Sequence, residues 1–97
     1  MLKGILPKGG VIYDLGIRNP FTEIMEKEGY TVINSEGQDF DFEYNIEIPK
    51  EVDLITGFEI LEHLVSPFPL LKNLFLQDYK LHHKTIYFCQ ILKNLNL

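Results

Sequence analysis

The sequence predicts an α/β fold, a parallel sheet of about four strands with flanking helices. Short apolar runs of high β propensity alternate with stretches of helical periodicity. The first strand, helix and strand follow one another closely enough to form a right-handed parallel βαβ unit. The 97 residues, of which 45% are hydrophobic, fit one small domain. We therefore expect a single domain over residues 1–97.

The first unit combines two β-rich runs with strong helix boundary signals between them. Residues 11–15 form a short apolar run of the buried, non-alternating kind. Asn19 is a suitable N-cap, and Pro20 suits the first turn of a helix, where its missing N–H costs nothing. Gly29 is well placed to end that helix. Residues 30–34 then form a second strand.

The second half of the chain predicts further elements in the same alternating order. Residues 35–48 are acidic and aromatic, and we expect a loop there with at most one short edge strand. Residues 53–56 are the third predicted strand. Residues 59–64 begin a helix, and residues 70–75 carry an apolar, core-facing stripe on a second helical piece that follows two prolines. The last predicted strand lies within residues 84–92.

Composition excludes several classes of function. The net charge of −5 and the scattered basic residues argue against a nucleic-acid-binding face. No stretch approaches the roughly 20 apolar residues that span a bilayer. The single cysteine, Cys89, cannot form an internal disulfide and fits a reducing compartment. We expect a cytoplasmic protein with no nucleic-acid or membrane partner.

Two polar positions near strand ends predict a nucleotide or nucleoside site. Asp14-Leu15-Gly16 closes the first strand, and glycine there lets the backbone approach a ligand. Glu36 follows the second strand at roughly the 20-residue interval at which dinucleotide folds place the acid that accepts ribose hydroxyls. A turn glycine and a solvated loop acid are the competing interpretation, and spacing alone leaves both open.

A longer motif resembles a known family. The segment Asp53-Leu-Ile-Thr-Gly-Phe-Glu-Ile-Leu-Glu-His-Leu-Val-Ser-Pro67 is similar to the Phe-Asp-hydrophobic-hydrophobic-x-x-x-Glu-x-Leu-Glu-His-hydrophobic-x-x-Pro pattern of class I S-adenosylmethionine-dependent methyltransferases of the type 11 or 23 group. Asp14-Leu15-Gly16 matches the opening of that family's Asp-x-Gly-x-Gly-x-Gly loop. The resemblance covers residues 11–75, and residues 76–97 match poorly. It implies a Rossmann-like, incomplete class I methyltransferase fold.

The resemblance also implies roles for individual residues. The cofactor would be S-adenosylmethionine, and the methyl acceptor would be a small molecule or a protein. The residues implied to contact the cofactor are Asp14 at the methionine amino group, Gly16, Glu36 at the ribose, Asp39 at the adenine, Phe58 and Glu59. Glu62 and His63 would face the acceptor as catalytic residues, with His63 the candidate base. A structural role for His63 at the surface remains the alternative. Asp53, at the opposite end of its strand, is expected to be structural.

Departures from the family pattern open a second reading. Arg18 and Pro20 stand where the family has glycines, which predicts either a different loop path or weakened cofactor binding. The alternative is therefore a non-catalytic interaction module or a truncated product. A dinucleotide oxidoreductase ranks last, because the Gly-x-Gly-x-x-Gly pattern is absent. A sheet that lacks strands leaves an edge exposed, which predicts self-association into a homo-oligomer.

One cluster has the spacing of a metal site. Glu59, Glu62 and His63 are at i, i+3 and i+4, so a helix would bring them to one face. Nothing else in the sequence supplies an obvious fourth ligand, and we expect no metal. The adjacent residues His82 and His83 diverge and are expected in a loop.

Overall fold

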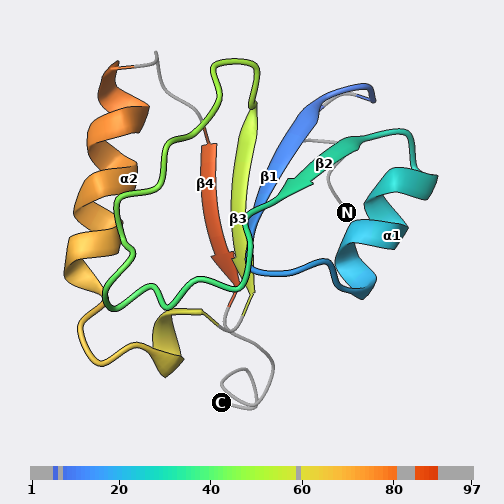
Figure 1. The fold of residues 1–97 in the computed structure, drawn as a ribbon. Coiled ribbons are helices and arrows are strands. Elements are labelled where there is room, and N and C mark those ends of the chain that lie inside the picture. Colours follow the sequence, from blue (N-terminus) through green and yellow to red (C-terminus); the bar gives the residue numbers. More distant parts are fainter. Residues whose placement is uncertain (1–5, 7, 59, 81–84, 90–97) are drawn as a thin grey trace, which may run out of the picture.

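The computed structural model describes residues 6, 8–58, 60–80 and 85–89 (Figure 1). Within them the elements are, in order, β1 (Val11–Leu15), α1 (Pro20–Lys27), β2 (Thr31–Asn34), β3 (Leu54–Phe58), the 3-10 turn η1 (Leu61–His63), α2 (Phe68–Lys80) and β4 (Thr85–Cys89). All four predicted strands are present. Residues 84 and 90–92, which the prediction included in the last strand, lie outside the described residues, as do His82 and His83.

The sheet is parallel throughout, as predicted. β2, β1 and β3 form a three-stranded sheet in that order, and β4 extends it beside β3. The chain reaches β2 on one side of β1 and then returns to build β3 on the other side (Figure 1). The strand order therefore reverses between β1 and β3, and open α/β sheets bind ligands above such a reversal, beyond the carboxyl ends of the strands.

Alternating residues of the central strands divide the core between the two faces of the sheet. Ile12 and Leu54 pack with Met25 of α1 on one face. Tyr13 and Ile55 point to the other face, where their cluster contains residues of the β2–β3 connection and of α2. Because each face has its own cover, the sheet is the central layer of the domain.

Helix α1 begins and ends where the sequence predicts. The Asn19 side chain accepts hydrogen bonds from the N–H groups of Phe21 and Thr22, and the Thr22 hydroxyl accepts one from the Asn19 N–H. This reciprocal capping box satisfies donors that the first turn otherwise leaves unpaired. Gly29 follows the helix with φ of 98°, a conformation that favours glycine. The boundaries of α1 are thus set by its own sequence.

The β2–β3 connection is held by α2 rather than by strand pairing. No part of residues 35–48 forms a strand, so the edge strand that the sequence allowed is absent from them. Instead, the Gln77 side chain accepts a hydrogen bond from the Ile48 N–H (2.8 Å) and donates one to the Ile46 carbonyl. One glutamine therefore occupies the backbone groups that a neighbouring strand would have used.

Two helical predictions need correction. The described part of residues 59–64 contains only η1, because Ile60 provides no side-chain cap and Leu64 is already extended. Pro67 adds to this effect, since a proline disfavours helical geometry at the residue before it. The stripe over residues 70–75 is core only in part. Leu70 and Leu74 are fully buried, but Phe75 is 55% exposed.

None of the described helices is long and apolar enough to cross a membrane.

Candidate functional site

A pocket of about 460 Å³ opens at the carboxyl edge of the sheet. Its walls come from the turn after β1, the connection after β2 and the segment after β3. Five of the predicted site residues line it: Gly16, Glu36, Asp39, Phe58 and His63. The volume lies within the range of small-molecule sites, roughly 300–1,000 Å³. The predicted residues are thus brought to one pocket from distant parts of the sequence.

Asp14 does not line this pocket and is fully buried. Its Oδ1 accepts a hydrogen bond from the Thr56 hydroxyl (2.6 Å). Its Oδ2 accepts one from the side-chain amide of Asn19 (2.8 Å) and one from that of Asn34 (3.2 Å). Burial raises the pKa of the Asp14 carboxyl above its ordinary value, although the three hydrogen bonds oppose that rise. Asp14 therefore joins β1, β2, β3 and the start of α1 at one carboxylate.

Asp14 and Asn19 were predicted from the sequence as functional or capping residues, but the other members of this cluster were not. Asn34 and Thr56 are the residues that stand opposite Asp14 in β2 and β3. A polar residue at the same height in three neighbouring strands was the available signal. It becomes readable only once the register of the strands is known.

The turn after β1 passes directly into the helix cap. Gly16 has φ of 107°, a conformation that side-chain-bearing residues rarely adopt, and its N–H donates to the Ser35 hydroxyl (2.7 Å). Arg18 does not line the pocket and instead pairs with Glu26 on the surface of α1. Pro20 is the first residue of α1. Arg18 and Pro20, the two departures from the pattern of glycines, therefore belong to a short turn that leads directly into α1.

The connection after β2 supplies the acidic wall of the pocket. The Glu36 side chain is exposed, and none of the hydrogen bonds found within the described residues involves its carboxylate. Asp39 is also exposed, and its Oδ1 accepts a hydrogen bond from the Asp41 N–H (3.1 Å). The Oε1 atom of Gln38 is buried and has no hydrogen-bond partner in the structure. Gln38 was not predicted as a site residue, and its unused acceptor is the clearest unsatisfied group at this pocket.

The segment after β3 supplies the aromatic wall. The ring of Phe58 packs on that of Phe21 from α1, with centroids 4.4 Å apart and planes inclined by 50°. Such tilted aromatic pairs are favourable beyond the area that they bury. Phe21 therefore fixes the position of a predicted site residue.

The remaining predicted residues divide between the pocket and its surroundings. His63 is exposed at the pocket. Glu62 does not line it, and both of its carboxylate oxygens are buried without a hydrogen-bond partner. Glu59 lies outside the described residues. Asp53 accepts a hydrogen bond from the Val11 N–H (2.9 Å) at the opposite edge of the sheet, which fits its predicted structural role.

The charge of the pocket selects among ligands. Three acidic residues, Glu36, Asp39 and Asp41, belong to the described lining, and no lysine or arginine does. The N–H groups at the start of α1 are already occupied by the Asn19 side chain, so they are not available to a phosphate. No group of three or more His, Cys, Asp or Glu residues in the described ranges is arranged to hold a metal ion.

Comparisons of this chain with models of protein families, with curated proteins and with solved structures found no match.

Proposed function

We propose that the pocket binds S-adenosylmethionine and that the chain is a domain of a methyltransferase. The observation that carries this proposal is the charge of the pocket, which combines three acidic residues with an absence of lysine and arginine from its described lining. S-adenosylmethionine has a positive sulfonium and a positive amino group, both of which an acidic pocket favours. The position of the pocket also supports the proposal, because open α/β sheets bind ligands beyond the point where the strand order reverses.

The residues that line the pocket suit the parts of this cofactor. The free carboxylate of Glu36 would accept hydrogen bonds from the ribose hydroxyls, and Gly16 would let the turn pass close to the ligand. The unpartnered Gln38 oxygen would accept from an amino group. Phe58 would supply an apolar wall. Asp14 would act indirectly, by holding Asn19 and with it the turn.

His63 would be the catalytic residue on the acceptor side of the pocket. The bound cofactor supplies an electrophilic methyl group, so the protein chiefly has to align the acceptor and exclude water. His63, exposed at the pocket, would take a proton from an acceptor that carries one. Glu62 lies next to it in sequence but does not line the pocket, so it would not contact the acceptor directly.

The second candidate function is that of a non-catalytic interaction module. The observation that favours it is the turn after β1, where the Gly16 N–H is already bound to Ser35 and the helix cap follows at once. The outer edge of β2 also has no strand partner among the described residues. Pairing of such edges between two copies would give a homo-oligomer. A concentration-independent monomer in sedimentation would rule out this mode of self-association.

Calorimetric titration separates the two candidates. Titration with S-adenosylmethionine should release or absorb heat, S-adenosylhomocysteine should bind more weakly because it lacks the sulfonium charge, and NAD should not bind. Glu36→Gln should weaken binding by about tenfold, equivalent to about 1.4 kcal/mol. Glu51→Gln, an exposed acid outside the pocket, is the matched control. A folded protein that gives no heat with S-adenosylmethionine would favour the interaction module.

A further inference from the structure

A single carboxylate joins two walls of the candidate pocket. Asp41 belongs to the connection after β2, and it accepts hydrogen bonds from the N–H groups of Val65 (3.0 Å) and Ser66 (2.9 Å), which follow η1. Figure 1 shows η1 and the start of this connection at the lower end of the sheet, beyond the carboxyl ends of its strands. No other hydrogen bond found among the described residues joins residues 35–48 to residues 60–66. We call these two bonds the Asp41 latch.

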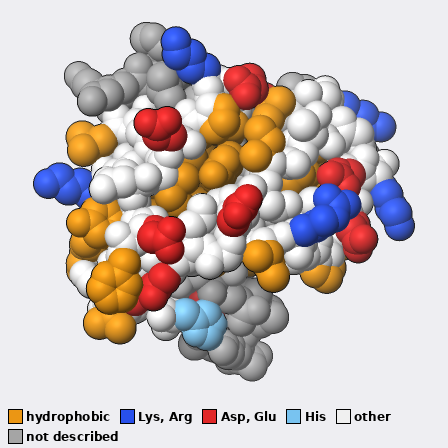
Figure 2. Space-filling model, in the orientation of Figure 1, with side chains coloured by type: hydrophobic (Ala, Val, Ile, Leu, Met, Phe, Trp, Pro, Cys, Tyr) orange, Lys and Arg blue, Asp and Glu red, His pale blue; other side chains and the backbone are white. Residues whose placement is uncertain are grey.

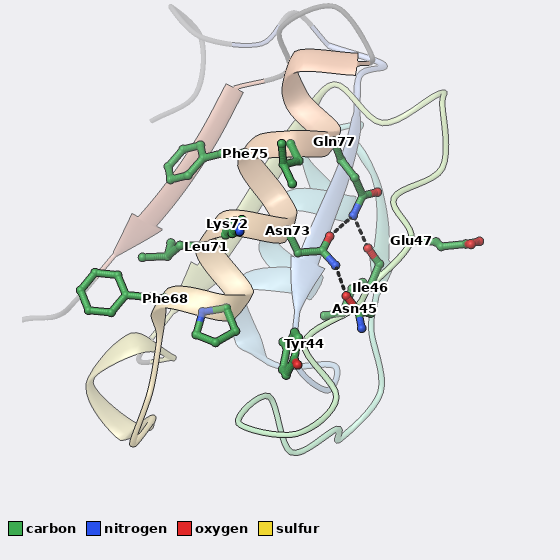
Figure 3. Close-up of a pocket in the computed structure, with 12 residues that line it drawn as sticks. Tyr44, Asn45, Ile46, Glu47, Phe68, Leu71, Lys72, Asn73, Phe75 and Gln77 are labelled. Carbon is green, nitrogen blue, oxygen red and sulfur yellow. Dashed lines mark hydrogen bonds between the residues drawn. The ribbon is translucent and has the colours of Figure 1, made fainter.

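The Asp41 side of the latch is held by its own surroundings. The Asp41 N–H donates to the Asp39 carboxylate (3.1 Å), so the turn is closed locally. The preceding residue, Phe40, is buried in the core cluster. Further along the connection, Gln77 of α2 binds the Ile46 carbonyl (Figure 3). Asp41 therefore presents its carboxylate from a segment that is anchored on both sides.

The other side of the latch is held much less. Val65 is 92% exposed, Ser66 is also exposed, and none of residues 60–66 is buried. The only helical structure among them is the three-residue η1, which has no side-chain cap. Segments with few buried contacts and exposed backbone hydrogen bonds open at the lowest free energy. The position of residues 60–66 therefore depends on the latch.

The surroundings offer Asp41 no competing cation among the described residues that line the pocket, since none of them is lysine or arginine. Figure 2 shows acidic side chains over the lower left of the molecule, where this connection approaches the start of α2. The two N–H groups are thus the donors available to the carboxylate. Hydrogen bonds to a charged acceptor are stronger than neutral ones, but exposure to solvent reduces their net contribution.

The residues just before the latch form part of the pocket. His63 and Leu64 line it and directly precede Val65, and Leu64 also packs against the core cluster that contains Phe40. Release of the latch would leave this packing as the contact that holds the wall in place. We propose that the Asp41 latch keeps the candidate pocket closed and that its release opens the wall formed by residues 60–66. Ligands would enter and leave through this opening.

An introduced thiol tests the opening without any ligand. Leu64→Cys places a cysteine in the partly buried wall, where alkylation by iodoacetamide should be slow while the latch is closed. In that background, Asp41→Ala should speed alkylation about tenfold, because both hydrogen bonds are lost. Peptide mass spectrometry separates the introduced cysteine from Cys89. Glu47→Ala, at an exposed acid of the same connection outside the pocket, is the matched control and should leave the rate unchanged.

The backbone side of the latch gives an independent test. Val65→Pro removes one of the two N–H donors, whereas Val65→Ala keeps it and controls for loss of the exposed side chain. Proline fits at this position because Leu64 has φ of −90° and ψ of 139°, a conformation compatible with a following proline. Val65→Pro should speed alkylation about threefold, and Val65→Ala should not. Combined with Asp41→Ala, Val65→Pro should add nothing, because no carboxylate remains to accept the N–H.

Two results would overturn the proposal. One is an unchanged alkylation rate in Asp41→Ala and in Val65→Pro, with circular dichroism showing an intact fold. The other is a combined effect equal to the product of the two separate effects, because the two residues would then act independently.

Binding kinetics extend the test to a ligand, and this part rests on the proposed function. Val65 does not line the pocket, so Val65→Pro should raise the association and dissociation rates of S-adenosylmethionine by the same factor, about threefold, and leave Kd nearly unchanged. A faster dissociation alone would contradict the latch, because it would mean that the substitution weakens the site. A chain that binds no S-adenosylmethionine would remove the proposed function, while the alkylation rates would still decide whether the latch opens the wall.

Discussion

The two sides of the candidate pocket are built in different ways. The turn after β1 is only a few residues long, and its polar groups converge on the buried carboxylate of Asp14. The connection after β2 runs over residues 35–53 without helix or strand and is tied down by the Asp41 and Gln77 side chains. The first side is therefore specified by several hydrogen bonds that share one carboxylate, and the second by single hydrogen bonds together with buried side chains such as Phe40 and Ile46. A ligand would meet a fixed wall, formed by the turn after β1, and an adaptable wall, formed by the connection after β2.

The largest expected effect is the loss of the carboxylate at the fixed wall. Asp14→Ala would remove the acceptor that the side chains of Asn19, Asn34 and Thr56 share, at a cost of about 3 kcal/mol in the free energy of unfolding. Urea unfolding followed by circular dichroism measures this loss. Asp39→Ala, on the adaptable wall, removes one exposed hydrogen bond and should cost less than about 1 kcal/mol. Equal losses of unfolding free energy in the two variants would contradict the difference between the fixed and the adaptable wall.

Loss of the two Gln77 hydrogen bonds that hold the adaptable wall should have the next largest effect on stability. Gln77→Ala removes the partner of the Ile48 N–H and of the Ile46 carbonyl, and we expect a loss of about 2 kcal/mol. Asn45→Ala removes only an exposed bond to Asn73 (3.0 Å) and serves as control. Hydrogen exchange should quicken at Ile48 in the glutamine variant alone. Unchanged exchange there would mean that packing, and not Gln77, holds the connection.

The difference between the two walls also explains what the sequence could predict. The strands and the cap of α1 depend on apolar runs and on side chains that act on their own neighbours, and these predictions are confirmed. The Asp14 cluster depends on strand register, and the Gln77 bonds join residues 29 and 31 positions apart. No local pattern encodes such pairings.

The mistaken helix over residues 59–64 shows the opposite error. Glu59-Ile-Leu-Glu-His-Leu64 has helical periodicity, but it is short, uncapped and followed by Pro67, so only η1 forms in its described part. Phe75 was assigned to the core because its spacing matches that of Leu70 and Leu74, which are buried. Spacing identifies an apolar face but cannot tell how much of that face the fold covers.

A smaller effect is expected from backbone strain at the two glycines that flank α1. Gly16 and Gly29 both have positive φ, and a Cβ at either position meets no close atom. Alanine at each should therefore cost a similar amount of stability, about 1 kcal/mol, through conformation alone. Only Gly16→Ala should also weaken S-adenosylmethionine binding in calorimetry, because Gly16 lines the pocket. Equal weakening by both would indicate a global effect.

The smallest effect concerns pH. Because the pKa of Asp14 is raised in the folded state, its contribution to stability is present below the ordinary pKa near 3.8 and is lost as pH rises through the folded value. The stability of wild type relative to Asp14→Asn should therefore decline with rising pH. The pKa of Glu26 is lowered, chiefly by the hydrogen bond from Arg18, so its contribution is lost as pH falls.

Wild type compared with Glu26→Gln should consequently show the opposite slope, rising with pH. Unfolding free energies of the three proteins from about pH 3 to pH 7 measure both slopes, and all other titrating groups cancel in each difference. Added salt should flatten the Glu26 slope, because that pair is exposed, and leave the Asp14 slope nearly unchanged, because that carboxylate is buried. Equal salt sensitivity would place the Asp14 carboxylate in contact with solvent and remove the basis for a fixed wall.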